Sequence, residues 1–359
     1  MTSDLHIRSL DDFPNNVSTY EPFKNQTFQT CDGIHCYPDS VFHAATILTI
    51  ILAIFGAFGN VLTVLAIMTS RLRNNINSIL ICHLSVADVV YCSFVLPLQA
   101  MTFYNRAWIL APVLCELHAA LRIWLIGVNM VLLSTIALYR FLHVVHPQIY
   151  TVYSQSPWFI GACILCWALP FIFCFTPLVG WWGEFSFQQR ILQCTFSITS
   201  SKSHKISTIT AGYVVPCLFI CFCYARIGFV VFTSRTKVSK GSQYRRQRAR
   251  RESFRLTGMM LLIFLGFLIG TTPFFTINIV DSKLVYPMPH IWTPFLAWVM
   301  YSMNPVIYTI MDANFQRAYH RLLLCMIFKP DNVAETSVAE RQNSLLAAGK
   351  NVENTPSPK

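Results

Sequence analysis

The chain has 359 residues, of which 54% are hydrophobic and 12% are charged, and its mean hydropathy is +0.48. A soluble globular protein carries about a quarter charged residues, so this composition excludes a soluble fold and predicts a membrane protein. The net charge of +11 gathers beside apolar segments, where basic residues fix topology and contact anionic membrane lipid, so no nucleic-acid partner is expected.

Residues 1–41 are polar and are predicted to form an extracellular N-terminal segment. Two glycosylation sequons begin in it, at Asn16 and Asn25. The segment lacks the basic start and apolar middle of a signal peptide, so we expect the first membrane span itself to direct insertion.

Seven apolar stretches follow, and each is long enough to cross a bilayer, which takes about 20 mostly apolar residues. They cover residues 42–68, 78–103, 113–145, 158–179, 206–233, 256–280 and 291–311. The chain is therefore predicted to be an all-α membrane protein, with a seven-transmembrane helix bundle over residues 42–311.

Basic residues in the short loops predict the orientation of this bundle. Arg71 and Arg73 lie between the first two spans, and eight Lys or Arg residues lie between positions 235 and 251. Such loops face the cytoplasm, so the N-terminus is expected outside and the C-terminus inside. We expect a multi-pass protein of the plasma membrane.

The part of the chain after the seventh span divides into two segments. Residues 312–328 alternate apolar and basic faces, which predicts an amphipathic helix on the inner leaflet. Cys325 in this segment is either a palmitoylation site or an unmodified thiol. Residues 329–359 are polar and are predicted to be a disordered cytoplasmic tail.

Most of the thirteen cysteines lie at lipid depth, where they behave as small hydrophobic residues. Four fall on the oxidising side of the membrane. We predict a Cys115–Cys194 disulfide, which would pin the loop after the fourth span across the bundle, and Cys31–Cys36 as the remaining pair. Sequence alone does not fix this connectivity.

Asp88 places a carboxylate at mid-membrane depth, where it needs partners or an ion. Asn60, Asn129 and Asn304 can converge on it as neutral hydrogen-bonding groups. The alternative is a structural polar cluster that only joins the helices.

Short motifs recur in order along the spans. They are Gly59-Asn60, Leu84-Ser85-Val86-Ala87-Asp88, Trp108 before Cys115, Arg140, Trp167, Pro216 with Tyr224, Phe267 with Pro273, and Asn304-Pro305-Val306-Ile307-Tyr308. With these motifs the chain resembles the rhodopsin-like (class A) G protein-coupled receptors from about residue 42 to residue 328. A closer likeness, to the Moody, trapped-in-endoderm and medium-chain fatty-acid receptor group, rests on Phe103-Tyr104…Trp108…Leu114-Cys115 and His146-Pro147-Gln148-Ile149-Tyr150.

The resemblance implies a receptor that binds an extracellular ligand and activates heterotrimeric G proteins, with arrestin and a receptor kinase as further partners. G-protein coupling is expected at Arg140, Tyr139, Phe141, Tyr224 and Tyr308. An activation relay is expected at Asn60, Asp88, Asn129, Phe267, Thr271, Pro273, Asn304 and Pro305. Family members bind sodium at this relay. Here Met300 and Tyr301 stand where polar sodium ligands are common, so we favour the relay over a sodium site.

One departure from the family pattern concerns the inner arginine, Arg140. The family usually has Asp or Glu immediately before it, but here Tyr139 stands there and carries no charge at neutral pH. Glu252 is then the one local restraint predicted for Arg140. Thr271 and Phe141 also replace a customary Trp and Tyr. Losing an ion pair worth ~1 kcal/mol raises a minor active population several-fold, so signalling without ligand is predicted.

The outer half of the bundle is expected to bind the ligand. Arg122 replaces the Asp of amine receptors, which favours an acidic or lipid-like small ligand. In the alternative, Glu116 or Asp281 neutralises Arg122, which then only shapes the bundle. The apolar wall is predicted to contain Tyr213, Phe274, Phe275, Trp292 and Trp298. Trp298 also replaces the opsin lysine, which excludes a retinal Schiff base, and no cofactor is expected.

Other functions are weighed against the receptor. A peptide ligand stays open, because the loop over residues 181–205 is long enough to shape a wide vestibule. A transporter is disfavoured, because the sequence has no internal repeat. A membrane enzyme is disfavoured, because His83, His118 and His143 lack metal-ligand spacing and no nucleophile motif is present.

Overall fold

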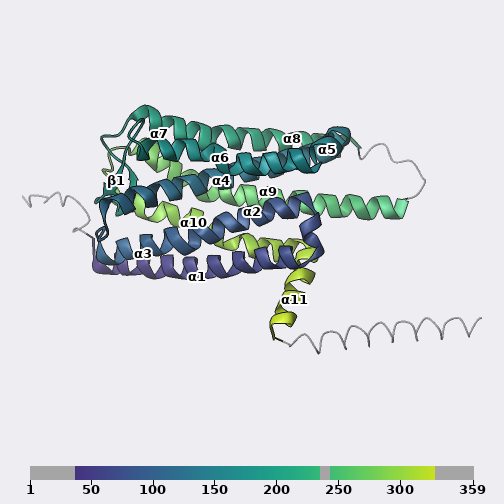
Figure 1. Ribbon diagram of the computed structural model, residues 1–359, viewed down its shortest axis with the longest axis horizontal. Helices are drawn as coiled ribbons and strands as arrows, with labels where there is room; N and C mark the ends of the chain where they lie inside the picture. The colour runs from purple at the N-terminus through teal and green to yellow at the C-terminus, as the bar shows by residue number, and fades with distance from the viewer. Residues whose placement is uncertain (1–36, 235–242, 328–359) are drawn as a thin grey trace, which may run out of the picture.

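The computed structural model describes residues 37–234 and 243–327, with side chains over residues 37–233 and 255–324. Long helices lie side by side along one axis, and a small hairpin caps one end (Figure 1). In chain order the helices of the bundle are α1 (Asp39–Thr69), α2 (Ile76–Val90), α3 (Leu96–Asn105), α4 (Pro112–Val145), α6 (Ser156–Leu178), α7 (Lys202–Ile209), α8 (Val215–Ser234), α9 (Gln243–Val280) and α10 (Pro287–Met311).

Within the described residues, six helical stretches are long and apolar enough to cross a membrane. They are Asp39–Thr69, Ile76–Asn105, Pro112–Val145, Ser156–Leu178, Lys202–Thr233 and Arg255–Val280. Helix α10 is the seventh member of the bundle, packed between α1 and α9. It is less apolar because it carries several prolines and polar residues, but no Asp, Glu, Lys or Arg. The predicted seven-helix bundle is therefore confirmed.

Two spans contain a π-helical turn shortly before a proline. The turn η3 (Tyr91–Val95) joins α2 to α3 ahead of Pro97, and η4 (Thr210–Val214) joins α7 to α8 ahead of Pro216. A proline lacks a backbone N–H, and a π-helical turn absorbs the resulting break in the helical ladder. Each turn buries a tyrosine, Tyr91 or Tyr213, inside the bundle.

Four short elements lie at the ends of the bundle. They are the turn η2 (Arg71–Asn74), helix α5 (Pro147–Tyr153), and strands β1 (Phe185–Gln188) and β2 (Gln193–Phe196). The strands pair antiparallel, with Phe187 opposite Cys194. Sequence patterns did not predict this hairpin, because each strand has only four residues inside a polar loop.

Helix α11 (Ala313–Ile327) turns away from the bundle axis at the end opposite the hairpin (Figure 1). The ring of Phe315 stacks on Tyr308 of α10, with 5.3 Å between ring centroids. The Tyr319 hydroxyl lies 2.7 Å from the hydroxyl of Thr63 on α1. The apolar side of α11 is thus held against the bundle, at the place where an amphipathic helix was predicted.

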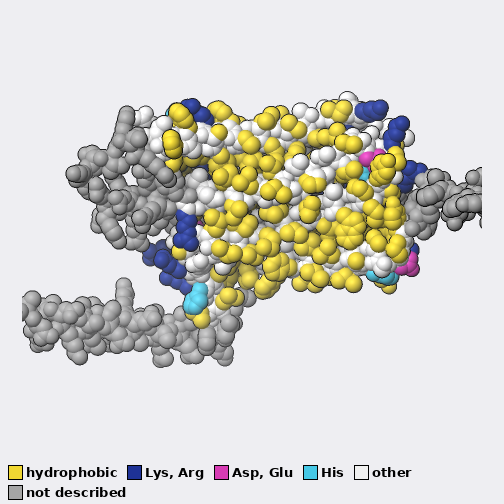
Figure 2. All heavy atoms as spheres, turned by 180° about the vertical axis from the view of Figure 1, so that it is seen from behind, with side chains coloured by type: hydrophobic (Ala, Val, Ile, Leu, Met, Phe, Trp, Pro, Cys, Tyr) yellow, Lys and Arg dark blue, Asp and Glu magenta, His cyan; other side chains and the backbone are white. Residues whose placement is uncertain are grey.

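The outer surface of the bundle is apolar around its middle. Figure 2 shows hydrophobic side chains covering this zone, with charged side chains gathered at the two ends. Ile54, Leu218 and Ile269, from three different spans, are each more than 60% exposed. Such a belt is stable only against lipid, so the chain is a multi-pass membrane protein.

Candidate functional site

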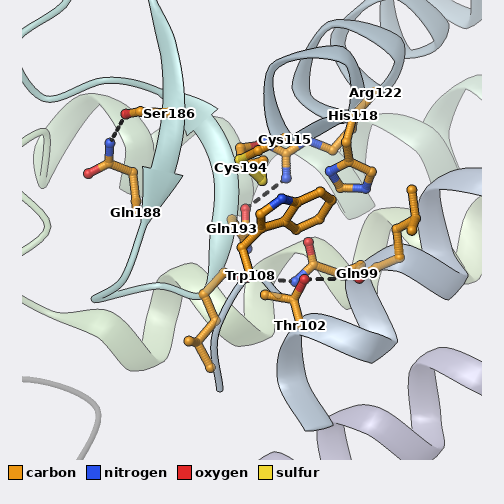
Figure 3. The surroundings of a disulfide bond; sticks show 12 residues. Gln99, Thr102, Trp108, Cys115, His118, Arg122, Ser186, Gln188, Gln193 and Cys194 are labelled. Carbon is orange, nitrogen blue, oxygen red and sulfur yellow. Dashed lines mark hydrogen bonds between the residues drawn. A yellow bond between two sulfur atoms is a disulfide. The ribbon is translucent and has the colours of Figure 1, made fainter. Parts of the chain in front are cut away.

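The hairpin is fastened to the helices by the predicted disulfide. Cys115 near the start of α4 and Cys194 in β2 are bonded, with 5.4 Å between their Cα atoms (Figure 3). Directly before Cys194, the Leu192 carbonyl accepts a hydrogen bond from Gln99 at 2.8 Å, and Gln193 Nε2 donates to the carbonyl of His290 at 3.0 Å. The hairpin therefore lies across the mouth of the bundle, tied to α3, α4 and α10.

Arg122 of α4 lies directly beneath this strand and is only 4% exposed. Its Nη1 donates to Gln193 Oε1 and its Nη2 to the Cys194 carbonyl, each at 2.9 Å (Figure 3). Both partners are neutral, and Arg122 makes no ion pair with a described carboxylate. Asp281, one of the two neutralising residues considered from sequence, instead accepts hydrogen bonds from backbone N–H groups and contacts His290 at 3.3 Å. The Arg122 charge is therefore fixed in place but not neutralised.

A cavity of about 330 Å³ adjoins Arg122, between α4, α6, α7, η4 and α9. Strand β2 roofs it, through Thr195 and Phe196. Its wall contains two cations, Arg122 and Lys205, and no Asp or Glu among the described residues. Apart from a few polar side chains near the hairpin, the rest of the wall is apolar, as expected for a binding site of a small amphiphile.

A second, much smaller cavity of about 20 Å³ also borders Arg122. Tyr91, Trp298 and Tyr301 line it, and the indole N–H of Trp298 donates to the Tyr91 hydroxyl at 3.0 Å. Thr271, which replaces the customary span-six Trp, also lines it and donates to its own helix at the Phe267 carbonyl. Arg122 thus lies between the larger cavity and a tightly packed layer of side chains.

Most of the predicted ligand-binding residues line these cavities. Arg122, Phe274 and Phe275 line both of them, and Trp298 lines the smaller one. Tyr213 lines neither, but its ring stacks on Phe275 with 4.1 Å between centroids. Trp292 also lines neither of these two cavities, and it packs against Phe295.

The predicted relay surrounds Asp88, which is fully buried. Asn304 Nδ2 donates to Asp88 Oδ2 at 2.8 Å. Asn129 lies nearby, but its Nδ2 donates to the Leu125 carbonyl at 3.1 Å. Asn60 does not join them directly, because its amide donates to the carbonyls of Gly56 and Tyr301 at 2.9 Å each. The structure therefore links α2 to α10 through Asp88, and α1 to α10 through Asn60.

Three buried oxygens beside this relay lack a hydrogen-bond partner among the described residues: Asp88 Oδ1, Ser85 Oγ and Asn60 Oδ1. The Met300 side chain ends in a thioether and has no oxygen to offer a cation, and it packs against Gly266 of α9. The Tyr301 carbonyl is already taken by Asn60. The preference for a hydrogen-bonded relay over a sodium site stays a prediction.

The proline positions of the relay differ in their surroundings. Pro305 packs against α1, where a Cβ added to Gly59 would lie 3.1 Å from its Cγ, so glycine permits this close approach. Pro273 faces the outer surface between α9 and α10. Phe267 lies 6.1 Å from Tyr301, measured between ring centroids. Phe267 therefore contacts α10 at Tyr301, whereas Pro273 lies at the surface.

At the other end of the bundle, Arg140 is only 3% exposed. Its Nε and Nη2 have no hydrogen-bond partner among the described residues. The side chains of Tyr224, Tyr150 and Asp312 lie near it. Asp312 was not considered from sequence, because it follows the seventh span and is far from Arg140 along the chain.

Tyr139 is directed away from its neighbour Arg140. Its hydroxyl donates to the carbonyl of Tyr153 in α5 at 3.1 Å, and its ring makes edge contacts with Tyr150 and Phe159. The side chain of Glu252 lies outside the described residues. Phe141 packs against Phe222 of α8. Tyr139 therefore fastens α4 to α5 and α6.

The arrangement of seven helices, with a disulfide at one end of the bundle and a buried arginine at the other, agrees with the comparisons with known proteins. A family model described as "7 transmembrane receptor (rhodopsin family)" matches residues 59–308. The chain belongs to this receptor family. The family consists of receptors that generally couple to G proteins, and not of enzymes.

Similar receptors come from insects and vertebrates. Protein trapped in endoderm-1 of Drosophila melanogaster is 30% identical over 319 residues, which cover 81% of this chain and 80% of that protein. G-protein coupled receptor moody of the same fly is 26% identical. The match covers 80% of this chain but only 52% of the fly protein. The predicted likeness to these two receptors is confirmed. Melatonin receptor type 1A of Phodopus sungorus is 25% identical, over 78% of this chain and 79% of that receptor.

Squid rhodopsin has the same fold, with a TM-score of 0.71 at 18% identity, over 83% of this receptor and 86% of that chain.

Sequence reasoning missed three residues in or near the cavity beside Arg122. Lys205 lies one residue before the predicted fifth span, and Thr208 lies within that span. Gln193 holds Arg122 from the hairpin. A lysine at the edge of an apolar run was a signal for Lys205, but nothing in the sequence marks Gln193 or Thr208.

Several predicted features lie outside the described part of the receptor. They are the sequons at Asn16 and Asn25, the Cys31–Cys36 pair, the Cys325 side chain and the tail over residues 329–359.

Proposed function

We propose that this receptor lies in the plasma membrane with its N-terminus outside, binds an acidic, lipid-like ligand, and activates heterotrimeric G proteins. The observation that carries the ligand class is the cavity beside Arg122 and Lys205, whose described wall is mostly apolar and contains no Asp or Glu. A carboxylate or phosphate joined to an apolar body fits such a wall, whereas a protonated amine is repelled.

Arg122 keeps donors free for this ligand. A guanidinium has five N–H groups, and two of those on Arg122 are used by Gln193 and Cys194. A buried cation without a counter-charge is costly, so an anion in the cavity would stabilise the bundle as well as bind to it. Lys205 adds a second cation to the cavity wall, and the Asp281 carboxylate lies near it outside the wall.

The size of the cavity favours a small ligand over a peptide. Strand β2 closes over it, and about 330 Å³ remains beneath. This volume is at the lower end of the range of ~300–1,000 Å³ typical of small-molecule sites. The loop over residues 181–205 thus covers the cavity, and it does not form the wide vestibule that a peptide needs.

The inner mouth supports coupling to a G protein and signalling without ligand. Two nitrogens of the buried Arg140 lack partners among the described residues, so an inserted partner chain can satisfy them. Tyr139 is bonded to Tyr153 and provides no counter-charge. The resting state is then held by fewer contacts than in receptors with an acid at this position, and some active population is expected.

The experiment compares Lys205→Gln with Lys202→Gln, an exposed lysine on the same helix that does not line the cavity. G-protein dissociation is measured in cells at matched surface expression, against long-chain carboxylates, lysophospholipids and peptides. We expect Lys205→Gln to weaken the potency of acidic lipids ~10-fold or more, since a charge-assisted hydrogen bond is worth ~1.5–3 kcal/mol. Lys202→Gln should respond as wild type. Equal potency in the two variants, or responses to peptides alone, would overturn the ligand proposal.

A further inference from the structure

The larger cavity has a polar end and an apolar end. Its polar side chains lie near the hairpin, and they include Arg122, Lys205 and Thr208. The Thr208 hydroxyl oxygen is buried and has no hydrogen-bond partner among the described residues. A buried hydroxyl without a partner costs free energy, so its position beside two cations indicates where the head group of a ligand would bind.

The apolar end reaches deep into the bundle. Along α4 the cavity wall runs from Arg122 to Val131, a rise of roughly 13 Å at 1.5 Å per residue. Leu169 and Pro170 of α6, with Gly212 of η4, form the facing side. This polarity matches that of a lipid in the outer leaflet, whose head lies at the surface and whose chain points inward.

The cavity also reaches the lipid-facing surface of the receptor. Two residues of its wall, Leu169 of α6 and Ala211 of η4, are exposed there, Leu169 by 49%. Nearer the hairpin the two helices are joined, because His204 Nε2 donates to the Phe173 carbonyl at 2.9 Å. Below this bond α6 packs against α4 and makes few contacts with η4, so a side entrance to the cavity would lie there.

The hairpin covers the end of the cavity that faces the extracellular water. Thr195 and Phe196 form the roof, and Cys194 is fixed to Cys115 by the disulfide and to Arg122 by a hydrogen bond (Figure 3). A ligand that came from the water would have to displace this anchored strand, whereas one that came from the membrane would only pass Leu169 and Ala211.

We propose that the ligand is a single-chain lipid with an anionic head group, which passes sideways from the outer leaflet between α6 and η4. Its head lies against Lys205, Thr208 and Arg122, and its chain lies toward Val131. A volume of about 330 Å³ suits one acyl chain rather than two. This inference rests on the proposed function, which supplies the orientation and the anionic ligand class.

Two glycines allow a matched test. A side chain at Gly212 would extend into open space at the cavity, since no atom lies within 4 Å of an added Cβ. Gly228 on α8 has equally open surroundings but does not line the cavity. Gly212→Leu therefore narrows the side opening, and Gly228→Leu is its control. Ala211→Phe narrows the same opening from a neighbouring position, in case Gly212→Leu does not fold.

The full-length receptor is reconstituted in phosphatidylcholine vesicles that contain a diazirine-tagged probe. The probes are a long-chain fatty acid, a lysophosphatidic acid and, as a neutral control, a monoacylglycerol. Photolabelling is followed over time and mapped by mass spectrometry. We expect one or both anionic probes to label the cavity wall in wild type and Gly228→Leu, with little labelling by the neutral probe. Gly212→Leu and Ala211→Phe should be labelled about tenfold more slowly, since passage then requires a transient opening.

Labelling of Gly212→Leu and Ala211→Phe at the wild-type rate would overturn sideways passage. If Lys205→Gln still abolished labelling in that case, the anion site of the proposed function would stand. Equal labelling by the neutral probe would overturn the head-group assignment. Absence of cavity labelling by both anionic probes in wild type would overturn this inference and the proposed ligand class together.

Discussion

Both ends of the bundle bury an arginine, and neither arginine has a paired carboxylate among the described side chains, but they are held differently. Arg122 donates to Gln193 and Cys194 at 2.9 Å each. Arg140 leaves two nitrogens without partners among the described residues. Neutral partners hold Arg122 in one position with its charge intact, which suits a binding site. Few contacts hold Arg140, which suits a group that changes partner when a protein binds.

The largest effect is expected from reversing the charge at Arg122. Arg122→Glu should abolish the response to acidic lipids at matched surface expression, because an attractive cation becomes a repulsive anion at a buried position. The measurement is a dose–response curve for G-protein activation.

Gln193→Met is the control for this variant. It removes one of the two hydrogen bonds from Arg122 to the hairpin but leaves the cation, so it separates this anchoring contact from charge. Potency should then fall much less than in Arg122→Glu. If Arg122→Glu kept wild-type potency for every active ligand, the outer arginine would have no part in recognition.

Sequence alone predicted the helices but not these two environments. Apolar runs of the right length placed most spans within a few residues of their observed ends, because lipid demands that composition. The exception is α9, which begins at Gln243, well before the predicted start at residue 256. The partner of Arg122 comes from a hairpin 71 residues further along the chain, and no local pattern encodes that contact. The disulfide was predicted, and it fixes the loop, but not which polar groups of the loop face inward.

The direction of a side chain was equally hidden from sequence. The sequence identified Tyr139 as an uncharged neighbour of Arg140, but not its bond to Tyr153, since that depends on how α5 folds back. The π-helical turns η3 and η4 were also not predicted, because the prolines that follow them are compatible with an ordinary helix.

The second prediction concerns how loosely Arg140 is held. Tyr139→Asp should lower signalling without ligand several-fold, because a carboxylate beside Arg140 can form an ion pair worth ~1 kcal/mol in the resting state. The measurement is basal G-protein activity at matched surface expression.

Tyr139→Phe is the matched control, since it keeps the ring against Phe159 and removes only the hydroxyl bond to Tyr153. Its basal activity should stay close to that of wild type. Unchanged or higher activity in Tyr139→Asp would mean that the resting state does not depend on a counter-charge for Arg140.

The smallest expected effect concerns the support behind Arg122. Gln193, which holds Arg122, also donates to the carbonyl of His290, and His290 contacts Asp281. Burial alone would raise the pKa of Asp281, but hydrogen bonds from the backbone N–H groups of Tyr286 and Val285, and the neighbouring His290, lower it below its usual value. The folded receptor therefore binds this proton less tightly than the unfolded chain.

The stability that Asp281 contributes is present above the unfolded pKa, near 4, and is lost as the pH falls through the lower folded value. Asp281→Asn should lower the thermal unfolding temperature of the purified receptor at neutral pH and should reduce the further loss below about pH 4. Asp39→Asn, at an exposed carboxylate paired with Arg106, is the control and should change the unfolding temperature less. If Asp281→Asn matched wild type at every pH, the turn after α9 would not support the hairpin, and Arg122 would be held by the disulfide-linked strand alone.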